Sequence, residues 1–351
     1  MRKTIVFRAD AGIEVGTGHV MRCLTLADLL HKQGAAIFFI CREQPGNLAE
    51  FIKKKGFQVI QVVPNQQEGD MTQTLHILQE IKPDWLIIDH YQVDEEWERL
   101  WRPAVGRIMV IDDLANRPHD CDMLLDQNFY EDIDRRYDGL VPEQCRRFLG
   151  PQYLILRPEF VEAKEGLKKC DGKVRRLLIF YGGSDPTNES EKALRALKSI
   201  HFTSMHVDVV TGNANPNRDK IKGLCQEINL SYHCQIDYLA KLMGEADLSL
   251  GAGGVAMWER CYLGVPTITT AVAENQCQSV RAAANFGAVQ YAGWHADVNE
   301  KNLADILKET VVLPKSLREM SNQALSLMQG SGKNGGAHPI VRVIMEEKGH
   351  A

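Results

Sequence analysis

The chain has 351 residues, of which 44% are hydrophobic and 25% are charged. This length is typical of two soluble domains rather than one. The 41 Lys and Arg residues against 46 Asp and Glu residues give a net charge of -5. No basic field is therefore available for a nucleic acid or for an anionic membrane surface.

The cysteines and the apolar runs indicate the cellular compartment. The nine cysteines are scattered and contain no C-x-x-C pair, which argues against a disulfide framework and against a structural zinc site. No apolar run approaches the ~18 residues of a membrane span. Residues 4–8 resemble a strand and follow Met1 too closely for a signal peptide. We expect a cytoplasmic protein without nucleic-acid or membrane partners.

The first half alternates short apolar runs with amphipathic stretches, which predicts βα units and a parallel sheet. The expected strands are residues 4–8, 36–41, 57–63, 85–89, 107–112 and 123–126. The clearest helix spans residues 20–30, with apolar residues on one face and Gly34 as its C-terminal cap. Further helices are expected at 47–55, 72–81 and 94–101.

The second half repeats this alternation after a polar, Lys- and Glu-rich stretch at 161–173, which predicts a linker. Strands are expected at 174–181, 206–211, 230–235, 248–250 and 265–270, and helices at 189–199, 255–263, 276–286, 302–310 and 317–329. The expected α/β architecture is two doubly wound, Rossmann-like domains facing a cleft, one over 1–160 and one over 174–351. The last helix is expected to pack back on the first domain.

Three glycine-rich loops follow expected strands and lead into helices. They are residues 12–19 (GIEVGTGH), 182–185 (GGSD) and 251–255 (GAGGV). Ligands of parallel α/β domains sit at the carboxyl ends of the strands, and helix N-termini suit phosphate. Glycine also lets the backbone approach a ligand closely. The substrate contacts expected from these loops are Gly16, Gly18, Gly183, Ser184, Gly253, Gly254 and Val255.

Standard phosphate and nucleophile motifs do not fit these loops. Met21 stands where a dinucleotide fingerprint needs its third glycine. Gly332-Lys333 lacks the Ser or Thr of a Walker A motif, and Pro186 stands in place of the last glycine of a nucleophile elbow. The sequence therefore supports neither an NTPase nor a serine hydrolase.

Polar side chains at the ends of two strands are candidates for catalysis. His19 opens a helix after a glycine-rich loop, and imidazole titrates near neutral pH, as a general base should. A capping or packed histidine is the alternative. Asp10 is expected to orient the ring or to bind substrate. Tyr91 offers a ring face and a hydroxyl to substrate, whereas His90 is interpreted as a solvated loop residue.

Other carboxylates and amides suggest a nucleotide site in the second half. Asp112 and Asp113 have no His or Cys beside them, so capping of the next segment is favoured over metal binding. Glu259 lies in the helix after the 251–255 loop, where its carboxylate can accept both ribose hydroxyls; the alternative is a solvated helix residue. Asn275 and Gln276 supply neutral polar groups. We expect no metal and no other cofactor.

Several segments together resemble one enzyme family. They are RADAGIEVGTGHVMRCLTLAD (8–28), IDDLANRPHDCDMLLDQN (111–128), YLILRPEF (153–160), GGSDP, GAGGVAMWE and the later NQ. On these segments the chain resembles the UDP-sugar hydrolases of pseudaminic acid biosynthesis, which act on UDP-2,4-diacetamido-2,4,6-trideoxy-β-L-altropyranose. That family is similar in turn to the peptidoglycan N-acetylglucosaminyltransferase, which has the two-domain GT-B fold.

The resemblance implies roles for particular residues. His19 matches the family's general base, and Glu259 and Asn275 match residues that hold the nucleotide sugar. Arg157 matches an arginine near the domain junction and is expected to contact the ligand. The second domain would bind UDP. The chain departs from the usual pattern at Gly12, where a Ser often follows the Ala.

These observations predict hydrolysis of a UDP-linked sugar at the anomeric carbon, with inversion and without a metal. The alternative enzyme is a GT-B glycosyltransferase in which His19 activates an acceptor hydroxyl instead of water. A third hypothesis is a module that binds a nucleotide sugar without turnover. Release of UDP and free sugar without an acceptor distinguishes the first from both others.

Overall fold

The computed structural model describes residues 2–12, 15–63, 68–167, 169–200, 205–331 and 338–346. The chain forms two compact units. Unit 1 comprises Met1–Gln127, Asp132–Ile155 and Gly332–Ala351, and unit 2 comprises Asn128–Glu131 and Leu156–Ser331. The Gly332-Lys333 pair considered above lies outside the described residues.

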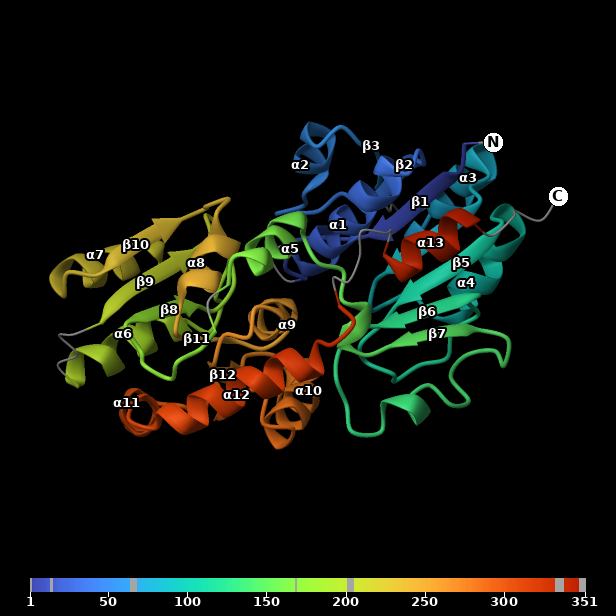
Figure 1. The fold of residues 1–351 in the computed structure, drawn as a ribbon. Coiled ribbons are helices and arrows are strands. Elements are labelled where there is room, and N and C mark those ends of the chain that lie inside the picture. Colours follow the sequence, from blue (N-terminus) through green and yellow to red (C-terminus); the bar gives the residue numbers. More distant parts are fainter. Residues whose placement is uncertain are drawn as a thin grey trace. The chain divides into compact units, whose positions relative to one another are not determined.

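Unit 1 is built around a seven-stranded sheet in which all neighbouring strands are parallel. The strands are β1 (Thr4–Ala9), β2 (Ala36–Arg42), β3 (Gln58–Val62), β4 (Trp85–Asp89), β5 (Arg107–Ile111), β6 (Met123–Asp126) and β7 (Arg146–Leu149). Their order is β3-β2-β1-β4-β5-β6-β7 (Figure 1). The helices are α1 (Gly18–Lys32), α2 (Ala49–Lys54), α3 (Asp70–Ile81), α4 (Glu95–Trp101) and α13 (Pro339–Glu346).

The strand order of unit 1 predicts where a ligand binds. Strands β1 and β4 are buried almost throughout, because helices cover both faces of a parallel sheet. The order reverses between these two strands, and doubly wound sheets bind ligands at such a switch point, beyond the carboxyl ends of the strands. The residues that follow β1 and β4 are therefore the candidates for function.

Unit 2 repeats this plan with six parallel strands in the order β10-β9-β8-β11-β12-β13. The strands are β8 (Arg176–Phe180), β9 (His206–Thr211), β10 (Ser231–Cys234), β11 (Leu248–Ala252), β12 (Thr267–Ala271) and β13 (Gln290–Trp294). The helices are α5 (Pro158–Glu165), α6 (Glu189–Ser199), α7 (Arg218–Glu227), α8 (Leu239–Glu245), α9 (Val255–Tyr262), α10 (Glu274–Asn285), α11 (Glu300–Val311) and α12 (Pro314–Leu327). Here the order reverses between β8 and β11. The two sheets confirm the expected doubly wound α/β fold.

The limits of the two units differ from the expected domains. Helix α5 spans the end of the expected first domain and the start of the expected linker, and it packs against α8. Unit 2 therefore begins at Leu156 rather than at residue 174. At the other end, α13 buries Ile340, Val341 and Ile344 in the core of unit 1. The helix expected at 317–329 is α12, which packs against α9 within unit 2. Unit 2 therefore ends at Ser331, and the last helix of the described chain, α13, belongs to unit 1.

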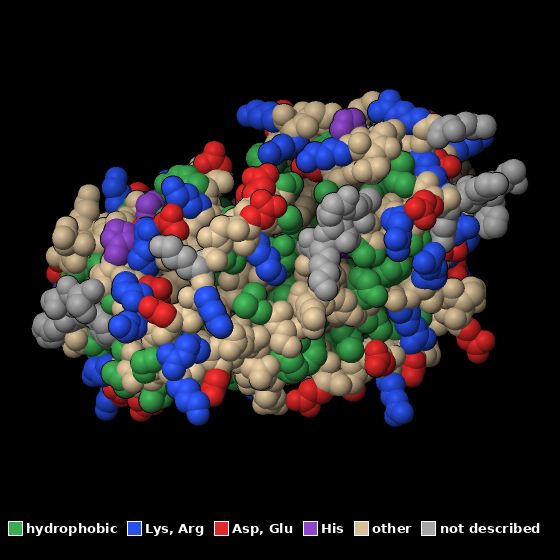
Figure 2. Space-filling view, viewed as in Figure 1, with side chains coloured by type: hydrophobic (Ala, Val, Ile, Leu, Met, Phe, Trp, Pro, Cys, Tyr) green, Lys and Arg blue, Asp and Glu red, His purple; other side chains and the backbone are tan. Residues whose placement is uncertain are grey.

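The surface in view carries charges of both signs (Figure 2), and the cysteines are not paired in disulfides. Figure 2 shows acidic and basic side chains interspersed over the face in view. None of the helices in the described parts of the chain has the length and apolar character required to cross a membrane. All nine cysteines are free thiols, and the Sγ atoms of Cys121 and Cys145 lie 3.6 Å apart.

Candidate active site

The imidazole of His19 is held by a carboxylate from the neighbouring central strand. His19 is the second residue of α1, and its Nδ1 lies 2.6 Å from Oδ1 of Asp89, the last residue of β4. With Asp89 ionised, Nδ1–H donates to the carboxylate, which leaves the lone pair on Nε2. Nε2 has no hydrogen bond to any described residue. This arrangement fits a general base that accepts a proton at Nε2.

Arg22 completes the support of His19 from the next turn of α1. Its Nε and Nη2 donate to Oδ2 and Oδ1 of Asp89, each at 2.8 Å. Burial raises the pKa of the Asp89 carboxyl, but the positive charge of Arg22 and the contact with His19 outweigh burial and hold this pKa below its usual range. Asp89 is fully buried and stays an acceptor for the imidazole at neutral pH.

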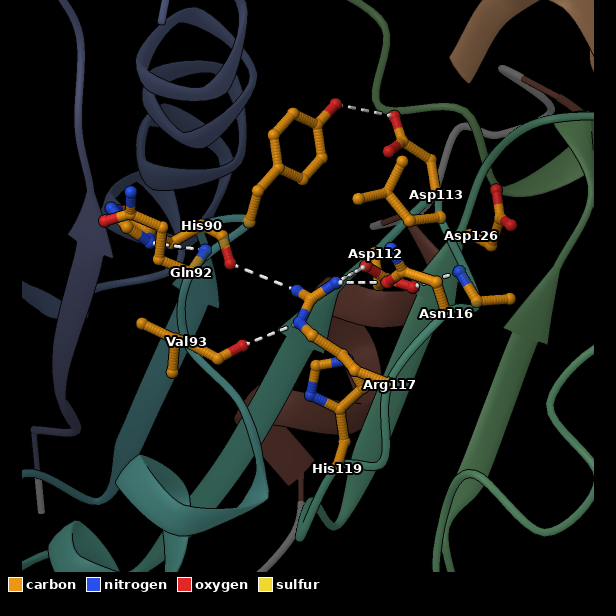
Figure 3. Close-up of polar contacts among 12 residues, drawn as sticks. His90, Gln92, Val93, Asp112, Asp113, Asn116, Arg117, His119 and Asp126 are labelled. Atoms are coloured by element: carbon orange, nitrogen blue, oxygen red, sulfur yellow. Dashed lines mark hydrogen bonds and ion pairs between the residues drawn. The ribbon is translucent and has the colours of Figure 1, made fainter. Parts of the chain in front are cut away.

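Tyr91 packs against the His19 ring in a T-shaped arrangement. The two ring centroids are 4.5 Å apart at 84°, and the tyrosine hydroxyl donates to Oδ2 of Asp113 at 3.5 Å. Arg117 stabilises the loop by donating to the carbonyl oxygens of His90 and Val93 (Figure 3). Tyr91 is 39% exposed, and its contact with substrate stays a prediction.

Asp10 does not orient His19, contrary to one expectation. Its carboxylate accepts two bonds from the fully buried Arg8 and one from Nε2 of His90 at 3.0 Å. His90 also accepts the Gln92 backbone N–H at Nδ1, so it is a structural residue rather than a solvated one. The backbone N–H of Arg42 donates to Asp10 as well. Asp10 therefore fixes the loop after β1, and its contact with substrate stays a prediction.

The first glycine-rich loop is closed by its own backbone. Gly12 and Gly16 exchange N–H to carbonyl bonds of 3.2 and 2.9 Å, and Gly16 has a φ of 77°, which favours glycine. Gly18, the first residue of α1, is exposed. A Cβ at Gly12 would lie 2.8 Å from Nε2 of Gln44, which donates to the Ala11 carbonyl. Gln44 thus occupies the space of the side chain that Gly12 lacks.

Asp112, the first of the paired aspartates after β5, stabilises the segment that follows it. Asp112 accepts from the Ala115 backbone N–H at 2.8 Å and from Arg117 at 2.9 Å, as expected for a residue that caps the next segment (Figure 3). Burial and the charge of the neighbouring Asp112 raise the pKa of the Asp113 carboxyl, although Arg22 opposes this. Among the described residues, no group of three or more His, Cys, Asp or Glu is placed to hold a metal ion.

In unit 2, the loop after β8 differs from the expected phosphate site. The Asp185 side chain accepts the backbone N–H groups of Glu189 and Ser190, each at 2.9 Å, and so occupies the start of α6. This helix N-terminus is therefore not free for phosphate. Gly183 and Ser184 remain exposed at the strand end, and their contact with a ligand stays a prediction.

The loop after β11 keeps the features that suit an anion. Helix α9 follows Gly254, whose φ is 76°, and no side chain caps its N-terminus at Val255. Gly253 leaves space for Val280 and Gln276, because a Cβ there would lie 2.7 Å from Cγ2 of Val280 and 3.0 Å from Oε1 of Gln276. Asn275 and Gln276 both lie in the first turn of α10. The structure thus brings the 253–255 loop together with Gln276.

Glu259 is buried rather than solvated. It is 5% exposed, and its Oε1 accepts from Nε and Nη2 of Arg157 at 3.2 and 3.1 Å. Burial raises the pKa of the Glu259 carboxyl, and Arg157 opposes this rise. Arg157 also contacts Glu159 at 3.0 Å and lies over the Phe160 ring. Two residues expected to contact the ligand, Arg157 and Glu259, are therefore paired with each other.

Comparisons with known proteins identify the family. No protein-family model matches the chain. The chain is 31% identical to the UDP-2,4-diacetamido-2,4,6-trideoxy-β-L-altropyranose hydrolase of Campylobacter jejuni over 247 residues, which are 69% of this chain and 82% of that protein. The chain belongs to this family of UDP-sugar hydrolases.

Two further relatives extend the match. The spore coat polysaccharide biosynthesis protein SpsG of Bacillus subtilis is 27% identical over 92% of this chain and 91% of its own length. An uncharacterised protein of Methanocaldococcus jannaschii is 28% identical over 75% of this chain, but the match spans only 54% of that protein.

Solved structures show the same fold at low identity. MurG of Acinetobacter baumannii aligns with a TM-score of 0.67 and 14% identity, covering 99% of this chain and 100% of that one. The rhamnosyltransferase SpnG, complexed with thymidine diphosphate, aligns with a TM-score of 0.64 and 14% identity over 98% and 99% of the chains. The fold is GT-B, as expected. Family and fold together indicate an enzyme that acts on nucleotide sugars.

Proposed function

We propose that this protein hydrolyses a UDP-linked 2,4-diacetamido-2,4,6-trideoxy sugar at its anomeric carbon and releases UDP and the free sugar. The observation that carries the proposal is the pairing of His19 Nδ1 with the buried Asp89, which leaves Nε2 to accept a proton. The named activity of the Campylobacter jejuni relative supports this substrate class and a role in pseudaminic acid, or nonulosonate, biosynthesis.

In the proposed mechanism, neutral His19 takes a proton from a water molecule at Nε2. The water oxygen bonds to the anomeric carbon as the bond from that carbon to the bridging oxygen breaks, and the bridging oxygen leaves with UDP. Asp89 stabilises the imidazolium that forms. Attack from the face opposite to the leaving group inverts the anomeric configuration.

We propose that unit 2 holds UDP through its 253–255 loop and Glu259. The uncapped N-terminus of α9 offers backbone N–H groups to the diphosphate, which stabilises the charge that grows on the leaving group. Glu259 accepts the ribose hydroxyls while Arg157 keeps its carboxylate in place. The proposed mechanism needs no metal.

The rival function is a GT-B glycosyltransferase, which the fold of the solved structures favours. In that reaction an acceptor hydroxyl replaces water at His19. Incubation of the enzyme with the UDP-sugar alone decides between the two, because only a hydrolase releases stoichiometric UDP and free sugar without an acceptor.

A reaction in oxygen-18 water tests the bond that breaks. If His19 directs water to the anomeric carbon, the label enters the sugar and UDP carries none, and NMR shows the first-formed sugar with the opposite anomeric configuration. Attack at phosphorus usually relies on metal ions and would instead place the label in UDP. Mass spectrometry of both products gives the answer, and labelled UDP would exclude the proposed role of His19.

Replacement of Glu259 by Ala is expected to weaken UDP binding by about 1–3 kcal/mol, because hydrogen bonds to a buried charged group are lost. Isothermal titration calorimetry with UDP measures the change. Glu159→Ala is the matched control, since Glu159 also contacts Arg157 but is only partly buried, whereas Glu259 is 5% exposed. Equal UDP affinity in the Glu259 variant and the control would make Glu259 a structural partner of Arg157 only.

A further inference from the structure

Arg260 is a fully buried arginine beside the glycine loop that precedes α9. It follows Glu259 in the helix and is 0% exposed. Its Nη2 donates to the carbonyl oxygen of Ala252 at 2.5 Å, so the side chain runs back along the helix toward the loop. Gly251 leaves the necessary space, because a Cβ there would collide with Nη1 of Arg260 and lie 2.6 Å from the Phe180 carbonyl oxygen.

The charge of Arg260 has no direct ion-pair partner in the described part of the chain, and the adjacent Glu259 carboxylate acts on it only through space. Its Nε and Nη1 have no hydrogen-bond partner there, and it forms no ion pair with a described carboxylate. The adjacent carboxylate, Glu259, accepts from Arg157 instead. The other buried arginines differ in this respect, since Arg8 pairs with Asp10 and Arg22 pairs with Asp89. An unpaired buried charge is unfavourable for folding, so its presence calls for a partner.

The surroundings of Arg260 favour an anion as that partner. Burial lowers the pKa of the guanidinium to about 10, which still leaves it protonated at neutral pH. The adjacent N-terminus of α9 carries no side-chain cap and follows two glycines. The helix dipole and the guanidinium therefore both place positive potential at the same loop.

We propose that Arg260 is a buried counter-charge for the diphosphate of the nucleotide, acting through space and through its bond to the Ala252 carbonyl rather than by direct contact. The proposal rests on the proposed function, which places UDP on unit 2. Arg260 would then be a positioning residue. Its charge destabilises the unliganded protein, and the diphosphate compensates that charge when it binds.

Replacement of Arg260 by Met, an unbranched apolar residue of similar length, tests this role. We expect UDP affinity to fall by about 10–100-fold and uridine affinity to stay within about twofold, because only the charged ligand interacts with the guanidinium. The unfolding temperature of the unliganded variant should rise by a few degrees, since an unpaired buried charge is removed. A merely structural arginine would lower it. Arg260→Lys keeps the charge and should retain the preference for UDP.

Three outcomes have distinct meanings. Unchanged UDP affinity in Arg260→Met, or equal loss for UDP and uridine, would overturn the counter-charge. Failure of the wild-type protein to bind UDP would instead contradict the proposed function, and the role of Arg260 that rests on it. If the Met variant does not fold, Arg260→Gln retains a donor for the Ala252 carbonyl and should show the same selective loss. Arg281→Met, at an exposed position of α10, is the control and should change none of the three measurements.

Discussion

Replacement of His19 by Asn or Ala is expected to lower kcat by about 10²–10⁴-fold, which is the usual contribution of a general base. Both variants remove the Nε2 acceptor, and the Asn side chain can still donate to Asp89 and so preserve the buried pairing. UDP affinity should change little, because the residues proposed to bind the nucleotide belong to unit 2. Steady-state release of free sugar and calorimetry with UDP measure the two quantities separately.

The matched control for this prediction is His76→Asn. His76 lies in α3 of the same unit, is exposed and forms an ion pair with Glu68, so its replacement should leave kcat unchanged. Near-normal turnover by both His19 variants would remove His19 from the mechanism. A large loss of UDP affinity would show that His19 acts in binding rather than in proton transfer.

Most of the fold could be predicted from the sequence because buried parallel strands are short apolar runs between helical patterns. Strand β4 and strand β9 were expected at their observed limits. Two edge strands were missed for physical reasons. Strand β7 (RRFL) begins with two arginines, which an edge position tolerates, and β13 (QYAGW) contains Gly293, where its pairing with β12 shifts register.

A site residue could be predicted only where the sequence around it forms a recognisable motif. His19 follows a glycine-rich loop and was selected on that basis, but Asp89 was passed over in favour of Asp10. Asp89 ends β4 and Asp10 directly follows β1, and these two strands pair in parallel with Ala9 opposite Asp89. Which of the two carboxylates contacts His19 depends on side-chain direction and on Arg8, which donates hydrogen bonds to Asp10. A sequence pattern contains neither of these facts.

The burial of Arg260 and Arg22 could not be predicted from the sequence either. Nothing in the segment WER distinguishes Arg260 from a solvated helix residue, because helical periodicity predicts which face is buried only when that face is apolar. Only the three-dimensional structure shows that Nε and Nη1 of Arg260 have no hydrogen-bond partner among the described residues. Arg22 was missed likewise, since its partner lies 67 residues further along the chain.

Replacement of Asp89 by Asn is expected to lower kcat by about 10²–10³-fold, although it changes only one atom. Arg22 donates to both oxygens of Asp89, whereas Asn offers only one acceptor. If the amide NH₂ group faces Nδ1 of His19, that nitrogen must accept, and the ring proton moves to Nε2. The base is then protonated on the nitrogen that should receive a proton from water.

Loss of the Asp89 charge should also destabilise the folded protein by about 3–5 kcal/mol, because it leaves Arg22 buried and unpaired. Since the pKa of Asp89 is depressed on folding, its stabilisation is fully present above the unfolded-state value of about 3.9 and is lost as the pH falls through the folded-state pKa. Assays at neutral pH therefore report the full effect.

The effect on catalysis must be separated from the effect on stability, and the chain offers a matched control for this purpose. Glu98 and His119 form a second buried carboxylate–imidazole pair in unit 1, with Nδ1 of His119 at 2.7 Å from Oε1 of Glu98. Glu98→Gln should lower the free energy of unfolding without lowering kcat per folded molecule. Asp89→Asn should lower both quantities, as measured by denaturant unfolding and by initial rates on the folded fraction. If the two variants share the same kcat, Asp89 serves only to neutralise Arg22, and the orientation of His19 must have another source.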